Sequence, residues 1–147
     1  MPYNRDKRSP IPKNATVSKV MSANKGKNSK PELALRKALF RSGIRGYRIH
    51  FKKIEGNPDI AWVGRRKVLF VHGCFWHRCP RCAYPLPRTN QDYWRTKFER
   101  NVARDRLHLR NLEQAEWKVL IVWECEIQQS LQKAVQCVKD FLDSDFR

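Results

Sequence analysis

The spacing of apolar residues predicts three helices. Ser29 is a preferred helix N-cap, apolar positions at helical spacing follow it, and Gly43 is a typical helix end. The same spacing returns over residues 89–115 and 128–142. One helix therefore opens the folded part of the chain, and two more lie toward its end.

Four other runs predict strands, because their apolar residues alternate or are continuous. These runs cover residues 47–53, 59–63, 67–73 and 118–124. The run 67–73 is apolar on both faces, which is typical of a central strand. Residues 74–88 hold three prolines and three cysteines and fit no regular element. This order predicts an α/β fold with a mixed central sheet flanked by helices.

Charge narrows the choice of partner. The chain has 147 residues, enough for one domain, and a formal net charge of +17. Such an excess of Lys and Arg favours nucleic acid as the partner. A charge that only keeps the protein soluble, or a binding protein without catalytic activity, would also explain it. No apolar run approaches the roughly 18 residues of a membrane span, and the first residues lack the apolar segment of a secretory signal. We therefore expect a cytoplasmic protein that binds nucleic acid and has no membrane contact.

Residues 1–28 differ in composition from the rest. Eight of the first 30 residues are basic and one is acidic, and large apolar residues are few. The pattern predicts a mobile basic arm that contacts DNA, or equally a disordered tail without that role. Residues 29–147 form the expected folded domain.

Four cysteines have the spacing of a metal site. Cys74, Cys79 and Cys82 lie in the irregular loop, and Cys125 follows the last strand. Thiolates from one tight loop and one distant element suit a tetrahedral structural Zn²⁺, which could order this loop. Buried thiols without a metal are the alternative. Cys137 falls on the apolar stripe of the last helix, so we expect a small core residue there.

An aspartate and two histidines flank the predicted central strand. Asp59 begins the strand before it, His72 lies near its end, and His77 follows five positions later. A carboxylate holding Mg²⁺ and a histidine taking a proton from water could together hydrolyse a phosphodiester. A structural N-cap and surface imidazoles would explain the same residues.

The long helix carries polar residues on its apolar face. That face is formed by Trp94, Phe98, Asn101, Asp105, Leu109 and Leu112. An acid on the core side is costly unless paired, so Asp105 needs a partner such as a histidine or an arginine. Glu32 is ambiguous, because the helix dipole alone would favour an acid in the first turn.

Four motifs occur in order along the chain. They are PD at 58–59, HGCFWH at 72–77, NVARDR at 101–106 and LIVWEC at 120–125. Together they resemble the very-short-patch-repair (Vsr) mismatch endonucleases over about residues 17–127. The resemblance implies a nuclease fold related to type II restriction enzymes. It also implies Mg²⁺-dependent nicking of one strand of double-stranded DNA beside the mispaired thymine of a T·G mispair.

The resemblance also implies roles for the residues at the motif positions. Asp59 and the backbone carbonyl of Val71 would bind Mg²⁺, and Glu32 would contribute to the site through water. His72 and His77 would be the active-site histidines. Of these, His77 is the expected base for water, and Asp105 would orient it.

Two further sets of residues match the family. Phe75, Trp76 and Trp94 occupy the positions of aromatic side chains that wedge into the base stack beside the mispair, although core packing would also explain Phe75 and Trp76. The basic residues of the arm would clamp the opposite groove by phosphate contact; they are Lys19, Lys25 and Lys27.

The zinc loop departs from the family at one position. Cys79 stands where the family usually has a histidine ligand, which leaves the identity of the third ligand open. Cysteine keeps tetrahedral chemistry available, so we still expect Zn²⁺ to be bound.

Three functions remain open at this point. The first is a mismatch-specific nicking endonuclease, expected to be monomeric and functionally linked to a DNA cytosine methyltransferase. The second is a nuclease of the same fold with another mispair or duplex-site specificity. The third is a zinc-stabilised DNA-binding module without hydrolysis.

Overall fold

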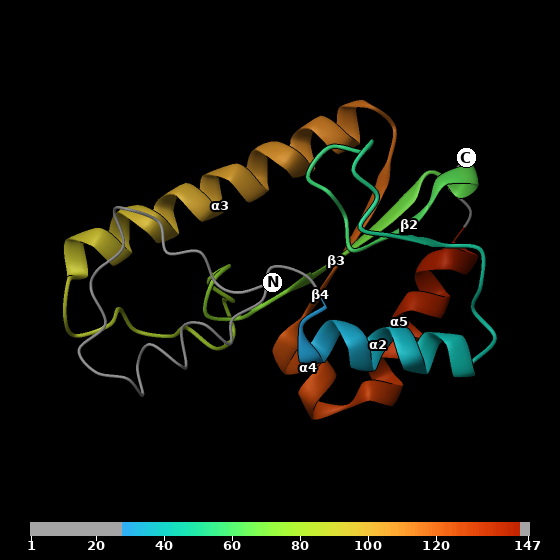
Figure 1. Cartoon of the computed structure of the whole chain (residues 1–147), viewed down its shortest axis with the longest axis horizontal. Helices are drawn as coiled ribbons and strands as arrows, with labels where there is room; N and C mark the ends of the chain where they lie inside the picture. The colour runs from blue at the N-terminus through green and yellow to red at the C-terminus, as the bar shows by residue number, and fades with distance from the viewer. Residues whose placement is uncertain (1–27, 145–147) are drawn as a thin grey trace.

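Four strands form a mixed sheet in the computed structural model, which describes residues 28–144 (Figure 1). Their order is β1-β2-β3-β4, and their bounds are Arg48–Ile49, Ile60–Trp62, Lys67–His72 and Lys118–Trp123. β1, β2 and β3 pair antiparallel, and β4 runs parallel to β3. The predicted mixed α/β class is confirmed, with 67–73 as an inner strand.

The helices cover both faces of the sheet (Figure 1). The long α3, Gln91–Gln114, lies on one face, whereas α2 (Lys30–Arg41), α4 (Glu124–Gln129) and α5 (Leu131–Asp143) pack together on the other. Ser29 caps α2 as predicted, because its side chain accepts a hydrogen bond from the Glu32 backbone.

Alternation along the strands divides the core into two clusters. Ile60, Leu69 and Val122 pack with Leu35 and Val138 on the side of α2 and α5. Ala61 and Val68 pack with Leu112 of α3 on the other side. Because side chains alternate between faces, His72 shares the face of Val68 and therefore points toward α3. The position of His72 along β3 therefore determines that its side chain lies on the side of α3.

Two local predictions were wrong, and one short helix was not predicted. The strand expected over 47–53 contains only Arg48–Ile49, because His50 adopts a left-handed backbone (φ 49°) and the chain then turns. The short helix α4 was not predicted. Cys137 is exposed and is not a core residue. None of the helices in the described range is long and apolar enough to cross a bilayer.

Candidate active site

A cleft of about 360 Å³ lies between the end of β3 and α3. Five residues predicted from the sequence line it together: Asp59, Val71, His72, His77 and Asp105. They come from the start of β2, the end of β3, the loop after it and the middle of α3. Residues that are 46 positions apart in the sequence therefore meet in one site.

The loop before Asp59 fits closely against the long helix. Gly56 has φ 79°, and a Cβ there would come within 3.2 Å of His108 and Phe70. Only glycine combines that backbone with so close an approach. The Glu55 carboxylate next to it accepts hydrogen bonds from His108 and Asn111 of α3, at 2.9 and 3.0 Å. These contacts fix the position from which Asp59 enters the cleft.

Asp59 is held from two directions. Its Oδ2 accepts a hydrogen bond of 2.7 Å from the Val71 backbone N–H, and a carboxylate oxygen of Glu32 lies within 4.8 Å of its own carboxylate. Burial raises the pKa of Asp59 to about 8, reinforced by the Glu32 carboxylate and opposed by the Val71 N–H. Asp59 therefore holds a proton at neutral pH, which a divalent cation could replace.

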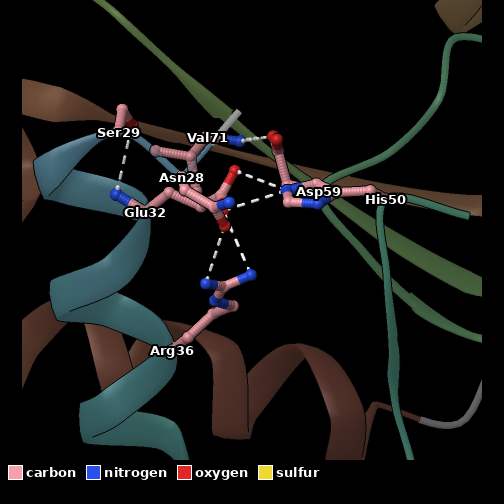
Figure 2. Close-up of polar contacts among 7 residues, drawn as sticks. All are labelled: Asn28, Ser29, Glu32, Arg36, His50, Asp59 and Val71. Atoms are coloured by element: carbon pink, nitrogen blue, oxygen red, sulfur yellow. Dashed lines mark hydrogen bonds and ion pairs between the residues drawn. The ribbon is translucent and has the colours of Figure 1, made fainter. Parts of the chain in front are cut away.

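Glu32 does not line the cleft and reaches it through Asp59. It is only 2% exposed. Figure 2 shows its side chain between Arg36, which forms an ion pair of 3.3 Å, and His50, whose Nε2 lies 3.1 and 3.2 Å from the two carboxylate oxygens. Glu32, His50 and Asp59 place one ligand atom each within 4.8 Å of one another. We call these three residues the buried acid group.

A second set, of one acid and two histidines, lines the same cleft as Asp59. His77 Nδ1 lies 2.6 Å from Asp105 Oδ2, so the acid on the apolar face of α3 has the histidine partner predicted for it. Burial opposes ionisation of Asp105, but the His77 hydrogen bond and the nearby imidazoles outweigh it and lower its pKa. We call His72, His77 and Asp105 the imidazole group.

His72 is the buried member of the imidazole group. Its ring stacks on that of His77, with centroids 4.0 Å apart and an interplanar angle of 7°. Burial lowers the pKa of His72 to about 4, and the neighbouring His77 lowers it further against the pull of Asp105. His72 is therefore neutral at physiological pH and can donate or accept a hydrogen bond without carrying charge.

Aromatic side chains gather beside the imidazole group. Phe75, Trp76 and Trp94 have ring centroids 5.1–5.9 Å apart and rest on the buried Phe98. All three are half-buried, so the cluster is neither a closed core nor fully exposed. Asn101, the other polar residue on the apolar face of α3, donates a hydrogen bond of 3.2 Å to the Trp76 carbonyl. This contact ties the aromatic loop to the helix.

The four predicted cysteines converge. Their sulfur atoms lie within 4.8 Å of one another, and those of Cys79 and Cys125 are 3.9 Å apart. Four thiolates about 2.3 Å from a tetrahedral Zn²⁺ would be about 3.8 Å apart, so the donor set fits this metal. Burial opposes ionisation of Cys79, but the backbone N–H groups of Cys82 and Arg81 outweigh it and lower the thiol pKa. Cys79 could thus bind a metal as a thiolate.

Three predicted site residues cannot be placed, and one residue near the site was not predicted. Lys19, Lys25 and Lys27 lie outside the described residues, which begin at Asn28. His50 was expected only as part of the strand 47–53, without a role. Its position opposite Asp59 depends on where β1 ends, which the pattern of apolar residues does not indicate.

Comparison with known proteins identifies a family for this chain. The family model of the DNA mismatch endonuclease Vsr matches residues 10–82. The type II nicking enzyme V.NaeI of Lentzea aerocolonigenes is 45% identical over 138 residues, which cover 90% of this chain and 80% of that protein. The DNA mismatch endonuclease Vsr of Escherichia coli K12 is 36% identical over 113 residues, covering 77% and 72%. On this evidence the chain belongs to the Vsr family of DNA mismatch endonucleases.

Proposed function

We propose that this protein is a Mg²⁺-dependent endonuclease that nicks one strand of double-stranded DNA beside the mispaired thymine of a T·G mispair. The observation that carries the proposal is the shared cleft, which brings a buried aspartate together with a histidine that is paired with a second aspartate. A DNA-binding module without hydrolysis has no use for that combination.

The buried acid group would hold the cation. Asp59 and the Val71 carbonyl would supply direct ligands, and Glu32 would act behind Asp59. Oxygen donors from carboxylate and carbonyl groups are those that Mg²⁺ prefers. Bound there, the cation would stabilise the charge that develops on the phosphate.

The imidazole group would activate water. Asp105 accepts the Nδ1 proton of His77, which leaves Nε2 of that ring to take a proton from the attacking water. The stacked His72 restricts rotation of the His77 ring. Because His72 is neutral, it would donate a hydrogen bond to the phosphate without competing for the proton.

The aromatic cluster would open the base stack. A mispair stacks less well than a normal pair, so separating it from its neighbour costs less, and aromatic rings replace part of the lost stacking. Phe75, Trp76 and Trp94 form a half-buried surface next to the imidazole group, where such a wedge would set the cut beside the mispair. The basic segment with Lys19, Lys25 and Lys27 would clamp the other groove.

Zinc would hold the loop that carries these residues. Cys74, Cys79 and Cys82 bracket Phe75, Trp76 and His77, and Cys125 anchors them to the end of β4. A metal at these thiolates would therefore fix both the wedge and the catalytic histidine.

A second candidate is nicking at a defined site without a mispair, which the type II nicking enzymes among the relatives favour. One experiment separates the two. Labelled duplexes carrying T·G, other mispairs or none are incubated with Mg²⁺ and resolved on a denaturing gel. We expect one cut on the thymine strand of the T·G duplex. Equal cutting of matched duplexes would support the second candidate.

A further inference from the structure

His50 is the member of the buried acid group that has no role in the proposed function. It follows the two-residue strand β1, and its backbone N–H donates a hydrogen bond of 3.1 Å to the Asp59 carbonyl. The hairpin thus places His50 directly beside the residue proposed to bind the cation. Its side chain is 16% exposed, and that of Glu32 is 3% exposed.

The backbone of His50 is unfavourable for a residue with a Cβ. Its φ of 49° lies in the left-handed region, where Cβ crowds the following carbonyl oxygen. Such a conformation persists only when surrounding contacts hold it, and such residues cluster at functional sites. Here the conformation ends β1 and directs the imidazole toward α2 (Figure 2).

The imidazole and one guanidinium hold Glu32 together. His50 Nε2 lies within hydrogen-bond distance of both Glu32 oxygens, and Arg36 pairs with Oε2 at 3.3 Å. Arg36 is itself fixed by Asn28 Oδ1 at 2.9 Å. Because carboxylate oxygens are acceptors, Nε2 is the donor in this contact. The Glu32 carboxylate is thereby fixed in the orientation in which it meets Asp59.

We propose that His50 is a positioning residue, which fixes Glu32 against Asp59 so that the two acids form a divalent-cation site before DNA binds. The inference rests on the proposed function, in which Asp59 holds the cation. A hydrogen-bond partner of this kind typically contributes 10- to 100-fold, roughly, to metal affinity. His50 acts here through its donor and not as a ligand, since Mg²⁺ prefers oxygen.

The test measures cation binding by the full chain without DNA. Mn²⁺ serves as a probe whose free form is counted by electron paramagnetic resonance, with Mg²⁺ as competitor. A glutamine amide reaches as far as Nε2 and keeps the donor, whereas an asparagine amide is too short. We expect His50→Asn to weaken Mn²⁺ binding about 10- to 100-fold, and His50→Gln to stay within about 3-fold of the unchanged protein.

Controls separate this role from general damage to the fold. Cys137→Ser changes an exposed residue of α5, away from the buried acid group, so Mn²⁺ affinity should not change. With T·G duplex, His50→Asn should raise the Mg²⁺ concentration for half-maximal nicking and retain the rate at saturating Mg²⁺. A purely structural role would lower that rate and the melting temperature instead.

Two results would contradict either the positioning role of His50 or the cation site at Asp59. If His50→Asn and the unchanged protein bind Mn²⁺ equally while Asp59→Ala does not bind it, the positioning role is wrong and the cation site stands. If Asp59→Ala binds Mn²⁺ normally, the proposed cation site itself is wrong, whatever His50 does.

Discussion

The buried acid group and the imidazole group use the same residue types at one cleft. Each contains an aspartate that lines the cleft and lies close to a histidine of its own group. In the first, burial and a second carboxylate raise the pKa of Asp59 to about 8. In the second, a hydrogen bond from His77 overcomes burial and lowers the pKa of Asp105.

The opposite pKa shifts show how the surroundings of two aspartates can suit them to different chemical roles. An acid that holds a proton at neutral pH is poorly ionised until a cation displaces that proton, which suits a metal ligand. An acid that is fully ionised fixes the tautomer and orientation of its histidine, which suits a base. On the proposed function, the opposite pKa shifts of Asp59 and Asp105 assign them to these two tasks.

The largest expected effect comes from removing the cation ligand. Asp59→Ala should reduce nicking about 10³-fold or more, since a metal contributes several kcal/mol to stabilising charge on the phosphate. Duplex affinity, measured by fluorescence anisotropy, should change only a few-fold. Asp92→Ala is the matched control, because that acid is fully exposed on α3. If Asp59→Ala still nicked at the normal rate, the buried acid group would not be the cation site.

Asp105→Asn tests the other side of the comparison. The amide can present the wrong hydrogen-bond partner to His77, so we expect single-turnover nicking to fall about 10²- to 10⁴-fold. Cation affinity should remain, because Asp105 belongs to the imidazole group alone. A parallel loss of Mn²⁺ binding would mean that the two groups work as one.

The cysteine cluster should matter for one group only. Cys82→Ser should lower the zinc content measured by elemental analysis and reduce nicking roughly 10-fold or more, because the loop no longer fixes His77. Mn²⁺ binding at Asp59 should persist, since neither α2 nor β2 depends on this loop. Cys137→Ser, at an exposed position on α5, is the control with unchanged zinc. Full zinc content in Cys82→Ser would exclude Cys82 as a ligand.

The sequence predicted much of the imidazole group. Asp105 stood out because an acid on an apolar helix face needs a partner, and the structure provides His77. The cysteine spacing likewise predicted four converging thiols. The first signal is local to one helix, and three of the four cysteines lie in one loop, so periodicity and spacing could indicate them.

The buried acid group was harder to predict. Glu32 was explained equally well by the helix dipole, and the choice depended on Asp59 lying against it. His50 was missed because its role depends on a left-handed residue that ends β1 early, which strand periodicity does not indicate. Contacts between α2 and the hairpin are long-range, and their geometry is set by packing of the core around Leu35 and Ile60.

The last and smallest effect is a change in thermal stability, and its sign compares Asp59 and Asp105 directly. Asp59 has an ordinary pKa of 3.8 when unfolded and about 8 when folded, so the native state binds the extra proton between these values. Its contribution to stability is complete below pH 4 and is lost as pH rises through 8. The lowered pKa of Asp105 has the opposite consequence: its contribution is present above its unfolded pKa and is lost as pH falls.

The two asparagine variants should therefore shift thermal stability in opposite directions. In EDTA at pH 9, Asp59→Asn should raise the melting temperature by roughly 4 °C, the shift expected for about 1 kcal/mol, because a neutral amide removes the cost of a buried charge beside Glu32. Asp105→Asn should lower it at the same pH, because the ionised partner of His77 is lost. Scanning calorimetry from pH 5 to 9 measures both. If the two variants shifted in the same direction, the two aspartates would not occupy opposite electrostatic environments, and the division of roles between the groups would lose its physical basis.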